Sequence, residues 1–271
     1  MSASKPFDAA RAAALLDDAA RECRAVPQFE AGSFDLAQAY AIQRASIQRR
    51  IERGERMKGI KLGFTSRAKM VQMGVDSLIW GLLTDSMIEE EGGIVAPGRY
   101  IHPRVEPELC FLTRRKIDGP LTALEAVDHL EAVAPAMEII DSRYRDFRFT
   151  LEDVVADNCS SAGLVVGPWS RRFDGLSNAG VRLQLDGRDV QVGSTAAILG
   201  HPLRAVVQAS RLLHGAQMSL PAGSLIMAGA ATAAEALRAG VHVRCEIGSG
   251  EGALGAVEFH VGGAAAQGGA S

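Results

Sequence analysis

The chain has 271 residues, 47% of them hydrophobic, and a formal net charge of −3. This composition supports a sizeable core, and the near-neutral charge predicts neither nucleic acid nor an anionic membrane surface as a partner. No apolar run approaches the roughly 20 residues of a membrane span, no secretory signal is evident, and the four cysteines form no CxxC pair, so we expect a cytoplasmic protein with free thiols.

Two helices are predicted ahead of the first strand. Residues 8–25 are rich in alanine and carry paired charges, which predicts the first helix. The second is clearer, because Asp35 can cap it, apolar residues recur on one face, and Gly54 suits its C-terminal end. We expect both helices to contribute packing and no chemistry.

A lysine in an apolar strand follows these helices. Residues 60–64 predict a short strand, in which Lys61 stands between two apolar residues with a glycine beyond each of them. Such a lysine either is exposed at the surface or is held near a counter-charge. Glycines on both sides indicate that another group approaches the backbone closely. Thr65 or Ser66 can cap a further helix over residues 67–73.

Glu106 and Glu108 lie two residues apart in an apolar run that predicts a strand. Because side chains alternate between the faces of a strand, both carboxylates point the same way. Two like charges on a half-buried face repel each other and are costly to desolvate, and a hard divalent cation would reverse that cost. The alternative is a solvated outer face, with Pro107 at a sheet edge or a bulge.

A second apolar strand also carries a carboxylate. Thr122 and Glu125 form a capping box that predicts a helix to about residue 133. Residues 134–143 then predict a strand with Glu138 at its centre. Three carboxylates converging from two strands would form an oxygen site for Mg²⁺ or Mn²⁺, with positions left open for water and substrate. This second strand favours the metal site over the solvated face.

The rest of the chain adds a polar loop and further sheet. Asp141 and Arg143 are predicted to form a structural ion pair, and the alternative is that Arg143 lies near an anionic substrate. Residues 157–163 form a loop of small polar residues, which either presents hydroxyl and N–H groups to a carboxylate or is an ordinary turn. The six histidines show no metal-ligand spacing, and no G-x-S-x-G motif supports a serine hydrolase. The remaining elements are a hairpin around Asp186-Gly187, a helix over 202–215, strands at 224–228, 241–247 and 255–261, and a disordered tail over 263–271.

Four motifs, Gly59–Ser66, His102–Glu108, Ala136–Arg143 and Asp157–Ser161, form a specific combination. Together they resemble the fumarylacetoacetate hydrolase superfamily, over about residues 39–261. Within it, the chain is similar to the meta-cleavage branch of 2-hydroxypentadienoate hydratases and 4-oxalocrotonate (2-oxo-3-hexenedioate) decarboxylases. The resemblance implies an α+β fold with a mixed, strongly curved β-sheet roll. It also implies an N-terminal helical segment, residues 1–56, packed on a catalytic domain over residues 57–262.

The resemblance also assigns roles to individual residues. It carries a catalytic lysine onto Lys61 and a substrate-contacting serine onto Ser161, with Ser160 as its neighbour. Thr65 and Ile79 are expected to contact the substrate as well. Lys61 would hold the enolate, hold the leaving end of the substrate, or supply a proton. The family's metal ligands carry over onto Glu106, Glu108 and Glu138, with Mg²⁺ as the implied cofactor and Mn²⁺ as its substitute.

One departure from the hydratases bears on the activity. The hydratases carry an acidic residue where this chain has Ile79, and that acid is thought to help deliver water. Apolar Ile79 and Trp80 would instead exclude water and favour loss of CO₂ from a desolvated carboxylate. The resemblance therefore implies a carbon–carbon lyase that decarboxylates 2-oxo-3-hexenedioate, a 2-oxo dicarboxylic acid, to 2-hydroxypenta-2,4-dienoate. It further implies a homo-oligomer that forms a complex with the homologous hydratase. The nearest alternative is a hydratase of the same fold, followed by a homologous C–C hydrolase or isomerase. From another class, the alternative is a non-catalytic partner subunit.

Overall fold

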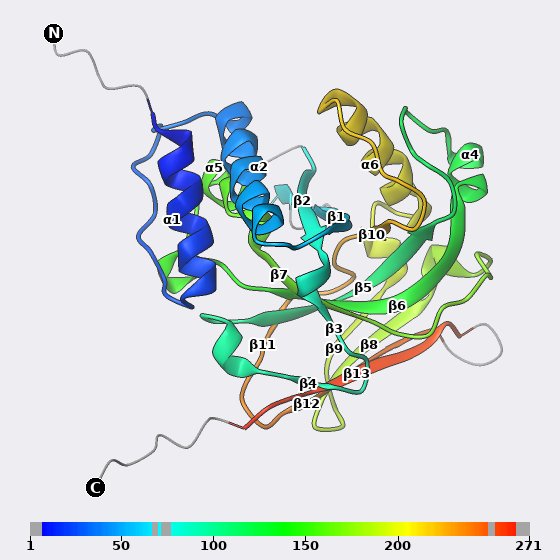
Figure 1. The fold of residues 1–271 in the computed structure, drawn as a ribbon. Coiled ribbons are helices and arrows are strands. Elements are labelled where there is room, and N and C mark those ends of the chain that lie inside the picture. Colours follow the sequence, from blue (N-terminus) through cyan, green and yellow to red (C-terminus); the bar gives the residue numbers. More distant parts are fainter. Residues whose placement is uncertain (1–6, 67–69, 72–76, 249–252, 264–271) are drawn as a thin grey trace, which may run out of the picture.

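Two β-sheets form the body of the molecule, and helices flank the larger one (Figure 1). The computed structural model describes residues 7–66, 70–71, 77–248 and 253–263. Within this part of the chain, no helix has both the length and the apolar character needed to cross a membrane. The helices described are α1 (Ala9–Arg21), α2 (Leu36–Glu52), α4 (Ala123–Asp128), α5 (Leu151–Ala156) and α6 (Leu203–Gly215). Short 3-10 turns occur at η1 (Asp85–Met87), η2 (Pro97–Arg99), η3 (Arg145–Phe147), η4 (Asn158–Ser160), η5 (Leu176–Asn178) and η6 (Thr195–Ala197).

The larger sheet has the strand order β2-β1-β10-β5-β6-β7-β3, and β11 also pairs with β5. Its strands are β1 (Met57–Gly63), β2 (Ile79–Thr84), β3 (Ile88–Glu89), β5 (Arg104–Thr113), β6 (Leu130–Ile140), β7 (Ser161–Val166), β10 (Leu225–Met227) and β11 (Glu235–Ala236). The sheet is mixed, because β1 is parallel to β10 and β3 to β7 while the other pairs are antiparallel. Figure 1 shows the long strands β5 and β6 curving through the middle of the molecule.

The smaller sheet lies beneath the larger one in Figure 1 and has the order β4-β13-β12-β8-β9. Its strands are β4 (Ile94–Val95), β8 (Gly180–Leu185), β9 (Arg188–Ser194), β12 (His242–Ile247) and β13 (Gly255–Val261). The predicted hairpin is confirmed, since β8 and β9 are joined through Asp186 and Gly187, whose φ angles are 49° and 73°. Phe111 of the larger sheet and Phe259 of the smaller one belong to the same buried cluster, so the main core is shared by the two sheets.

The N-terminal helices have a second core of their own. Leu16 of α1 and Ile42 of α2 pack in one buried cluster with Tyr144 and Val154 of α5. Asp35 caps α2 through a reciprocal capping box, because its carboxylate accepts from the backbone of Gln38 while the Gln38 side chain accepts from Asp35. The prediction of a mixed α+β fold with a strongly curved sheet and N-terminal helices is confirmed.

The structure corrects two local predictions. The helix predicted to about residue 133 ends at Asp128, and residues 130–133 begin β6, where they pair with β5. Pro107 marks neither an edge nor a bulge, because β5 lies between β6 and β10. The proline falls between the stretches of β5 that pair with β10 and with β11, where its missing N–H is not required.

Two further predictions lie largely outside the described residues. The helix predicted over residues 67–73 is described only at residues 70–71, and the disordered tail predicted over 263–271 is described only at residue 263.

Candidate active site

The three glutamates singled out by the sequence come together on neighbouring strands. Glu106 and Glu108 lie on β5, and Glu138 lies on β6 directly opposite Glu106 in the strand register. Each contributes a carboxylate oxygen to a group in which all three oxygens lie within 4.8 Å of one another. All three side chains are buried, with exposed fractions of 6%, 1% and 0%. The solvated-face alternative is therefore wrong.

Burial makes this group of carboxylates electrostatically unfavourable without a cation. Burial, followed by repulsion from Glu138, raises the pKa of Glu108 well above its ordinary value. Burial likewise raises the pKa of Glu138, although Lys61 opposes that shift. In the described part of the chain, Oε1 of Glu108 and Oε1 of Glu138 are buried without a hydrogen-bond partner. Hard carboxylate oxygens without partners are the donors that Mg²⁺ or Mn²⁺ would satisfy, so the residues fit such an ion.

Lys61 faces this carboxylate group from β1. Its side chain is 4% exposed, and Nζ donates a hydrogen bond to Oε2 of Glu138 at 3.0 Å. Burial alone would lower the pKa of Lys61, but the combined attraction of the surrounding acidic groups, Glu138 first among them and then Glu108 and Glu106, outweighs burial and raises the pKa above the ordinary value. The ammonium is therefore charged and held near a counter-charge. Of the two interpretations of the sequence, the exposed lysine is wrong and the lysine beside a counter-charge is confirmed.

The glycines beside Lys61 allow close contacts. A Cβ on Gly59 would lie 1.9 Å from the carbonyl oxygen of Leu225, and a Cβ on Gly63 would lie 2.7 Å from Cγ1 of Ile79. The predicted close approach at both glycines is confirmed. These contacts press β1 against β10 and β2, and so fix the position of Lys61.

A strained turn carries the two serines. Asn158, Cys159 and Ser160 are consecutive non-glycine residues with φ of 49°, 53° and 58°, a left-handed conformation that costs energy at each residue. The Asn158 side chain holds the turn to β2, accepting from the N–H of Leu82 at 2.8 Å and donating to its carbonyl at 2.9 Å. Strain of this kind persists only where the surroundings impose it, and it is common at functional sites.

Arg143 holds the same turn from the other side. It forms a buried ion pair with Asp157 and also donates to the carbonyl oxygens of Asp157, Asp141 and Ser161. The predicted ion pair between Asp141 and Arg143 is wrong, because the Asp141 carboxylate instead accepts from the N–H groups of Ile101 and His102. The partner of Arg143 lies 14 residues along the chain and is reached only because the turn folds back.

A cleft of about 390 Å³ opens above the carboxylates. Lys61 and Glu106 line it together with three of the other candidate residues or their neighbours, namely Thr65, Ile79 and Ser160. Ile79 is 3% exposed, so the cleft has an apolar wall at that point.

Ser161 and Trp80 are placed differently from the residues that line this cleft. Ser161 lines a separate cavity, and its hydroxyl lies near Glu138, whose raised pKa it partly offsets. Neither Ser160 Oγ nor Ser161 Oγ forms a hydrogen bond of good geometry within the described residues. Trp80 stacks on Tyr40 with ring centroids 5.0 Å apart, so it contributes to the core and not to the cleft wall.

Three further residues line the outer part of the cleft, and sequence reasoning missed them. They are Arg104, Phe147 and Arg148. Arg104 could have been found, because it stands two residues before Glu106 and therefore shares its face of the strand. Phe147 and Arg148 lie in an irregular loop, where the sequence has no periodicity that predicts orientation.

The chain is similar to several known proteins. The family described as "Fumarylacetoacetate (FAA) hydrolase C-terminal" matches residues 59–262. A 4-oxalocrotonate decarboxylase of a Pseudomonas species is 56% identical over 88% of this chain and 93% of its own length. A 2-keto-4-pentenoate hydratase of Paraburkholderia xenovorans is 38% identical over 77% of this chain and 79% of its own length. Among solved structures, the 4-oxalocrotonate decarboxylase from Pseudomonas putida G7, complexed with magnesium and adipate, is similar with a TM-score of 0.88 and 32% identity, over 93% of this chain and 97% of that one.

Proposed function

This chain belongs to the fumarylacetoacetate hydrolase family, and we propose that it is a carbon–carbon lyase that decarboxylates 4-oxalocrotonate (2-oxo-3-hexenedioate). The observation that carries the proposal is the buried group of three carboxylates beside a buried lysine, in which two carboxylate oxygens have no hydrogen-bond partner among the described residues. The identity of 56% to a decarboxylase and the similarity to one that binds magnesium and adipate support the same activity.

Glu106, Glu108 and Glu138 would hold the metal ion, which is Mg²⁺ in this proposal, with Mn²⁺ as a substitute. When bound, the metal supplies Lewis-acid stabilisation of the negative charge that develops at the 2-oxo end of the substrate. Support for an oxygen-binding cation comes from the raised pKa that burial gives Glu108, since a nearby cation would favour the ionised form.

The chemical step breaks the bond between C5 and C6 and releases C6 as CO₂. The electron pair of that bond forms C4=C5, the former C3=C4 pair moves to C2=C3, and the 2-oxo oxygen receives the negative charge. One proton on that oxygen then gives 2-hydroxypenta-2,4-dienoate. Lys61 is charged and lies beside the carboxylates, so it can hold this developing anion or donate the proton to it.

Substrate contacts are proposed for the polar and apolar residues around the cleft. Ser160 lines the cleft together with Thr65, and Ser161 lies beside Glu138. The hydroxyls of both serines lack a hydrogen-bond partner of good geometry among the described residues and would bind substrate oxygen. Ile79 would keep water from the reacting carboxylate, whose loss as CO₂ is favoured by desolvation. A hydratase would instead need a carboxyl group at the position of Ile79 to deliver water to the substrate.

The wider proposals follow the family. Residues 57–262 form the catalytic domain and residues 1–56 a helical segment packed on it. The protein acts in the cytoplasm in the meta-cleavage pathway of aromatic degradation. It works as a homo-oligomer, in complex with the homologous hydratase that consumes its product.

Hydration of the dienoate is the second candidate function, favoured by an identity of 38% to a named hydratase. The test is to supply purified protein and Mg²⁺ with 2-oxo-3-hexenedioate and to measure CO₂ together with the products. We expect CO₂ and 2-hydroxypenta-2,4-dienoate, with activity abolished by EDTA and restored by Mg²⁺ or Mn²⁺. Rapid formation of 4-hydroxy-2-oxopentanoate from the dienoate would identify a hydratase, and no turnover of either compound would identify a non-catalytic subunit.

A further inference from the structure

Two arginines line the outer part of the cleft and have no acidic partner in the described part of the chain. Arg104 and Arg148 are both exposed and both line the cleft that contains Lys61 and Glu106. Among the described residues, neither forms an ion pair. The contact recorded for the Arg104 guanidinium is with the ring of Phe147, whose centroid lies 4.5 Å away. Charged groups that face a cleft and lack a counter-ion are available to an anionic ligand.

Strand β5 orders the charges of the cleft by depth. Arg104, Glu106 and Glu108 share one face at intervals of two residues, about 6.6 Å apart along the strand. Glu108 is 1% exposed, Glu106 is 6% exposed, and Arg104 is exposed. The carboxylates of Glu106 and Glu108 therefore form a negative floor of the cleft, where a cation would lie. Arg104, two residues from Glu106 along β5, forms a positive mouth further out.

The loop that supplies Arg148 is held in a strained conformation. Asp146 and Phe147 are consecutive non-glycine residues with φ of 58° and 56°. The Phe147 ring lies between His102, at a centroid distance of 5.1 Å, and Phe149, at 5.9 Å. These contacts fix the loop in a backbone conformation that is costly at both residues. Phe147 and Arg148 are thereby presented to the cleft together.

We propose that Arg104 and Arg148 bind the second carboxylate of a dicarboxylic substrate, the one distant from the metal end. This inference rests on the proposed function and names the residues that select a diacid over a monoacid. A 2-oxo acid with a single carboxylate would fill the floor of the cleft and leave both guanidinium groups to water. A diacid would also form charge-assisted hydrogen bonds at the mouth, where the Arg fork suits a carboxylate.

The contact has a distinctive kinetic consequence. In decarboxylation the distal carboxylate loses its charge as it becomes CO₂, so an arginine bound to it stabilises the bound substrate more than the transition state. Removing the arginines should therefore raise KM and leave kcat unchanged or higher. A merely structural role for these residues would lower kcat and thermal stability together.

The direct test compares two ligands that differ only in the distal carboxylate, 2-oxohexanedioate and 2-oxohexanoate. Calorimetry with the Mg²⁺-loaded protein should show that the wild type binds the diacid at least about tenfold more tightly. Arg104→Met and Arg148→Met should each reduce this preference, and the double variant should abolish it, while the affinity for 2-oxohexanoate stays the same. Arg148→Lys, which keeps the charge, should retain part of the preference.

Arg145→Met is the matched control, because Arg145 is an exposed arginine of the same loop that does not line the cleft. It should bind both ligands as the wild type does. A double variant that keeps the preference for the diacid overturns the inference, as does a wild type without any preference. Because binding is measured without turnover, a protein that prefers the diacid through these arginines but releases no CO₂ would refute the proposed function and not the arginine site.

Discussion

At the scale of single residues, the floor of the cleft depends on contacts between different strands. Glu138 on β6 accepts from Lys61 on β1, and Glu108 on β5 accepts from the N–H of Gly229 at 2.8 Å. Each contact leaves the other oxygen of the carboxylate without a hydrogen-bond partner within the described ranges of the chain. The protein thus orients these two glutamates while keeping an oxygen of each available to a cation.

Glu106→Gln should remove metal binding and preserve the fold. The amide keeps the shape of the side chain but removes one negative charge from a group in which three carboxylates repel one another. We expect the affinity for Mg²⁺ or Mn²⁺ to fall by more than the about 10–100-fold typical of changes outside the ligand set. Metal titration by calorimetry measures this, with exposed Glu91→Gln as the control. An unchanged titration would contradict the assignment of Glu106 as a ligand.

Gly229→Ala should disturb the metal site through its neighbours. Gly229 has a φ of +100°, and a Cβ there would lie 2.2 Å from Oγ1 of Thr65. The added Cβ would clash with Thr65 and would strain the backbone, whose positive φ suits only glycine. Both effects would displace the N–H group that donates to Glu108. We expect it to cost about 3 kcal/mol of unfolding free energy or more, and to weaken metal binding.

Gly92→Ala is the control for this substitution. Gly92 also has a positive φ, of +72°, but no atom of the described residues lies within 4 Å of the position of its Cβ. It should cost about 1 kcal/mol and leave metal affinity unchanged. Denaturant unfolding and metal titration of both variants separate backbone strain from the clash, and equal effects would show that the contact with Thr65 is unimportant.

The sequence predicted residues of the floor better than residues of the mouth, for a physical reason. Strand alternation places Glu106 and Glu108 on one face whatever the rest of the chain does, and their shared charge made the pair recognisable. Ser160, and not Ser161, lines the cleft because of three left-handed residues, which composition does not reveal. Arg148 is likewise placed by a strained loop and packed aromatic rings.

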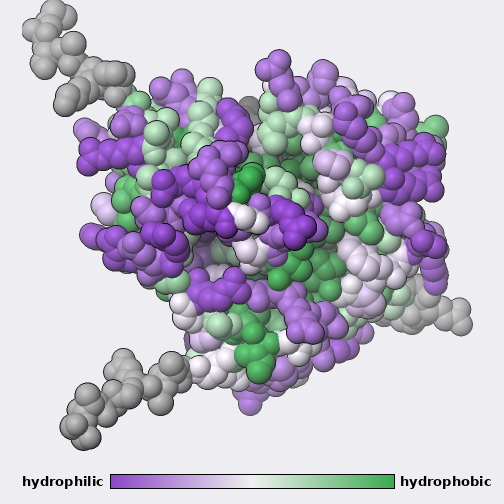
Figure 2. Space-filling model, viewed as in Figure 1, coloured by the Kyte–Doolittle hydropathy of each residue, from purple (hydrophilic) through white to green (hydrophobic). Residues whose placement is uncertain are grey.

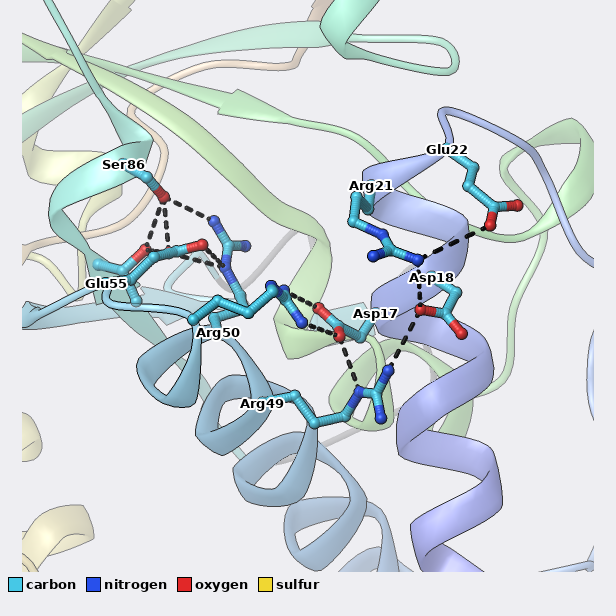
Figure 3. Close-up of polar contacts among 10 residues, drawn as sticks. Asp17, Asp18, Arg21, Glu22, Arg49, Arg50, Glu55 and Ser86 are labelled. Carbon is cyan, nitrogen blue, oxygen red and sulfur yellow. Dashed lines mark hydrogen bonds and ion pairs between the residues drawn. The ribbon is translucent and has the colours of Figure 1, made fainter.

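At the scale of elements, an ion-pair clamp joins the two N-terminal helices (Figure 3). Asp17 of α1 has a side chain that is only 2% exposed. Its carboxylate accepts from Nε of Arg49 at 2.8 Å and from both terminal nitrogens of Arg53 at 2.6 Å. Burial alone would raise the pKa of Asp17, but these hydrogen bonds hold it below its ordinary value. The clamp fixes α1 against α2.

Asp17→Asn should therefore loosen the helical segment. The substitution removes the negative charge and leaves two arginines that are each over a third exposed to water. We therefore expect the unfolding free energy to fall by about 2 kcal/mol, which is less than for a fully buried ion pair. Asp18→Asn, at a position that is 37% exposed, should cost less than about 1 kcal/mol. Denaturant unfolding at neutral pH measures both, and equal losses would argue against the clamp.

The same clamp determines whether Asp17 stabilises the protein at high or at low pH. The folded-state pKa of Asp17 is lowered from the model-peptide value of 3.8, so its contribution is fully present above about pH 4 and is lost as the pH falls through the lowered pKa. The difference in stability between the wild type and Asp17→Asn should accordingly shrink as the solution is acidified from pH 5 to about pH 2. A difference that stays constant over that range would show that Asp17 does not titrate in this way.

Element boundaries show where local signals fail. The capping boxes at Asp35 and Thr122 both form, because the groups involved are close in the chain. The helix after Thr122 nevertheless stops at Asp128, because residues 130–133 gain more from pairing with the buried strand β5 than from continuing a helix. Tertiary pairing of this kind cannot be seen in a short window of sequence.

At the scale of the whole molecule, hydrophilic side chains cover much of the face shown in Figure 2, and hydrophobic ones gather near its centre and lower part. Beneath them, the two sheets share a core, and the carboxylates extend from the middle of the larger sheet. Burying these carboxylates thus lowers the unfolding free energy of the whole protein. Anything that binds them in the folded state alone will raise the stability of the entire protein.

Metal should therefore protect the protein against unfolding. Magnesium at about 100 times its Kd should add about 2.7 kcal/mol to the unfolding free energy, and EDTA should remove this gain. The Glu106→Gln variant should show little response to either. Thermal or denaturant unfolding with and without metal measures the effect, and a wild type whose stability ignores both Mg²⁺ and Mn²⁺ would contradict the site.

One strand of this sheet holds residues of both the floor and the mouth of the cleft. Arg104 and Glu106 line the cleft and Glu108 lies beneath it, and all three share one face because they occupy alternate positions of β5, which is hydrogen-bonded on both sides. Inserting or deleting a single residue between them would turn those on one side of the change toward the opposite, apolar face. A change in the number of residues of β5 would therefore disturb the floor and the mouth of the cleft together, whereas a single substitution changes one position at a time.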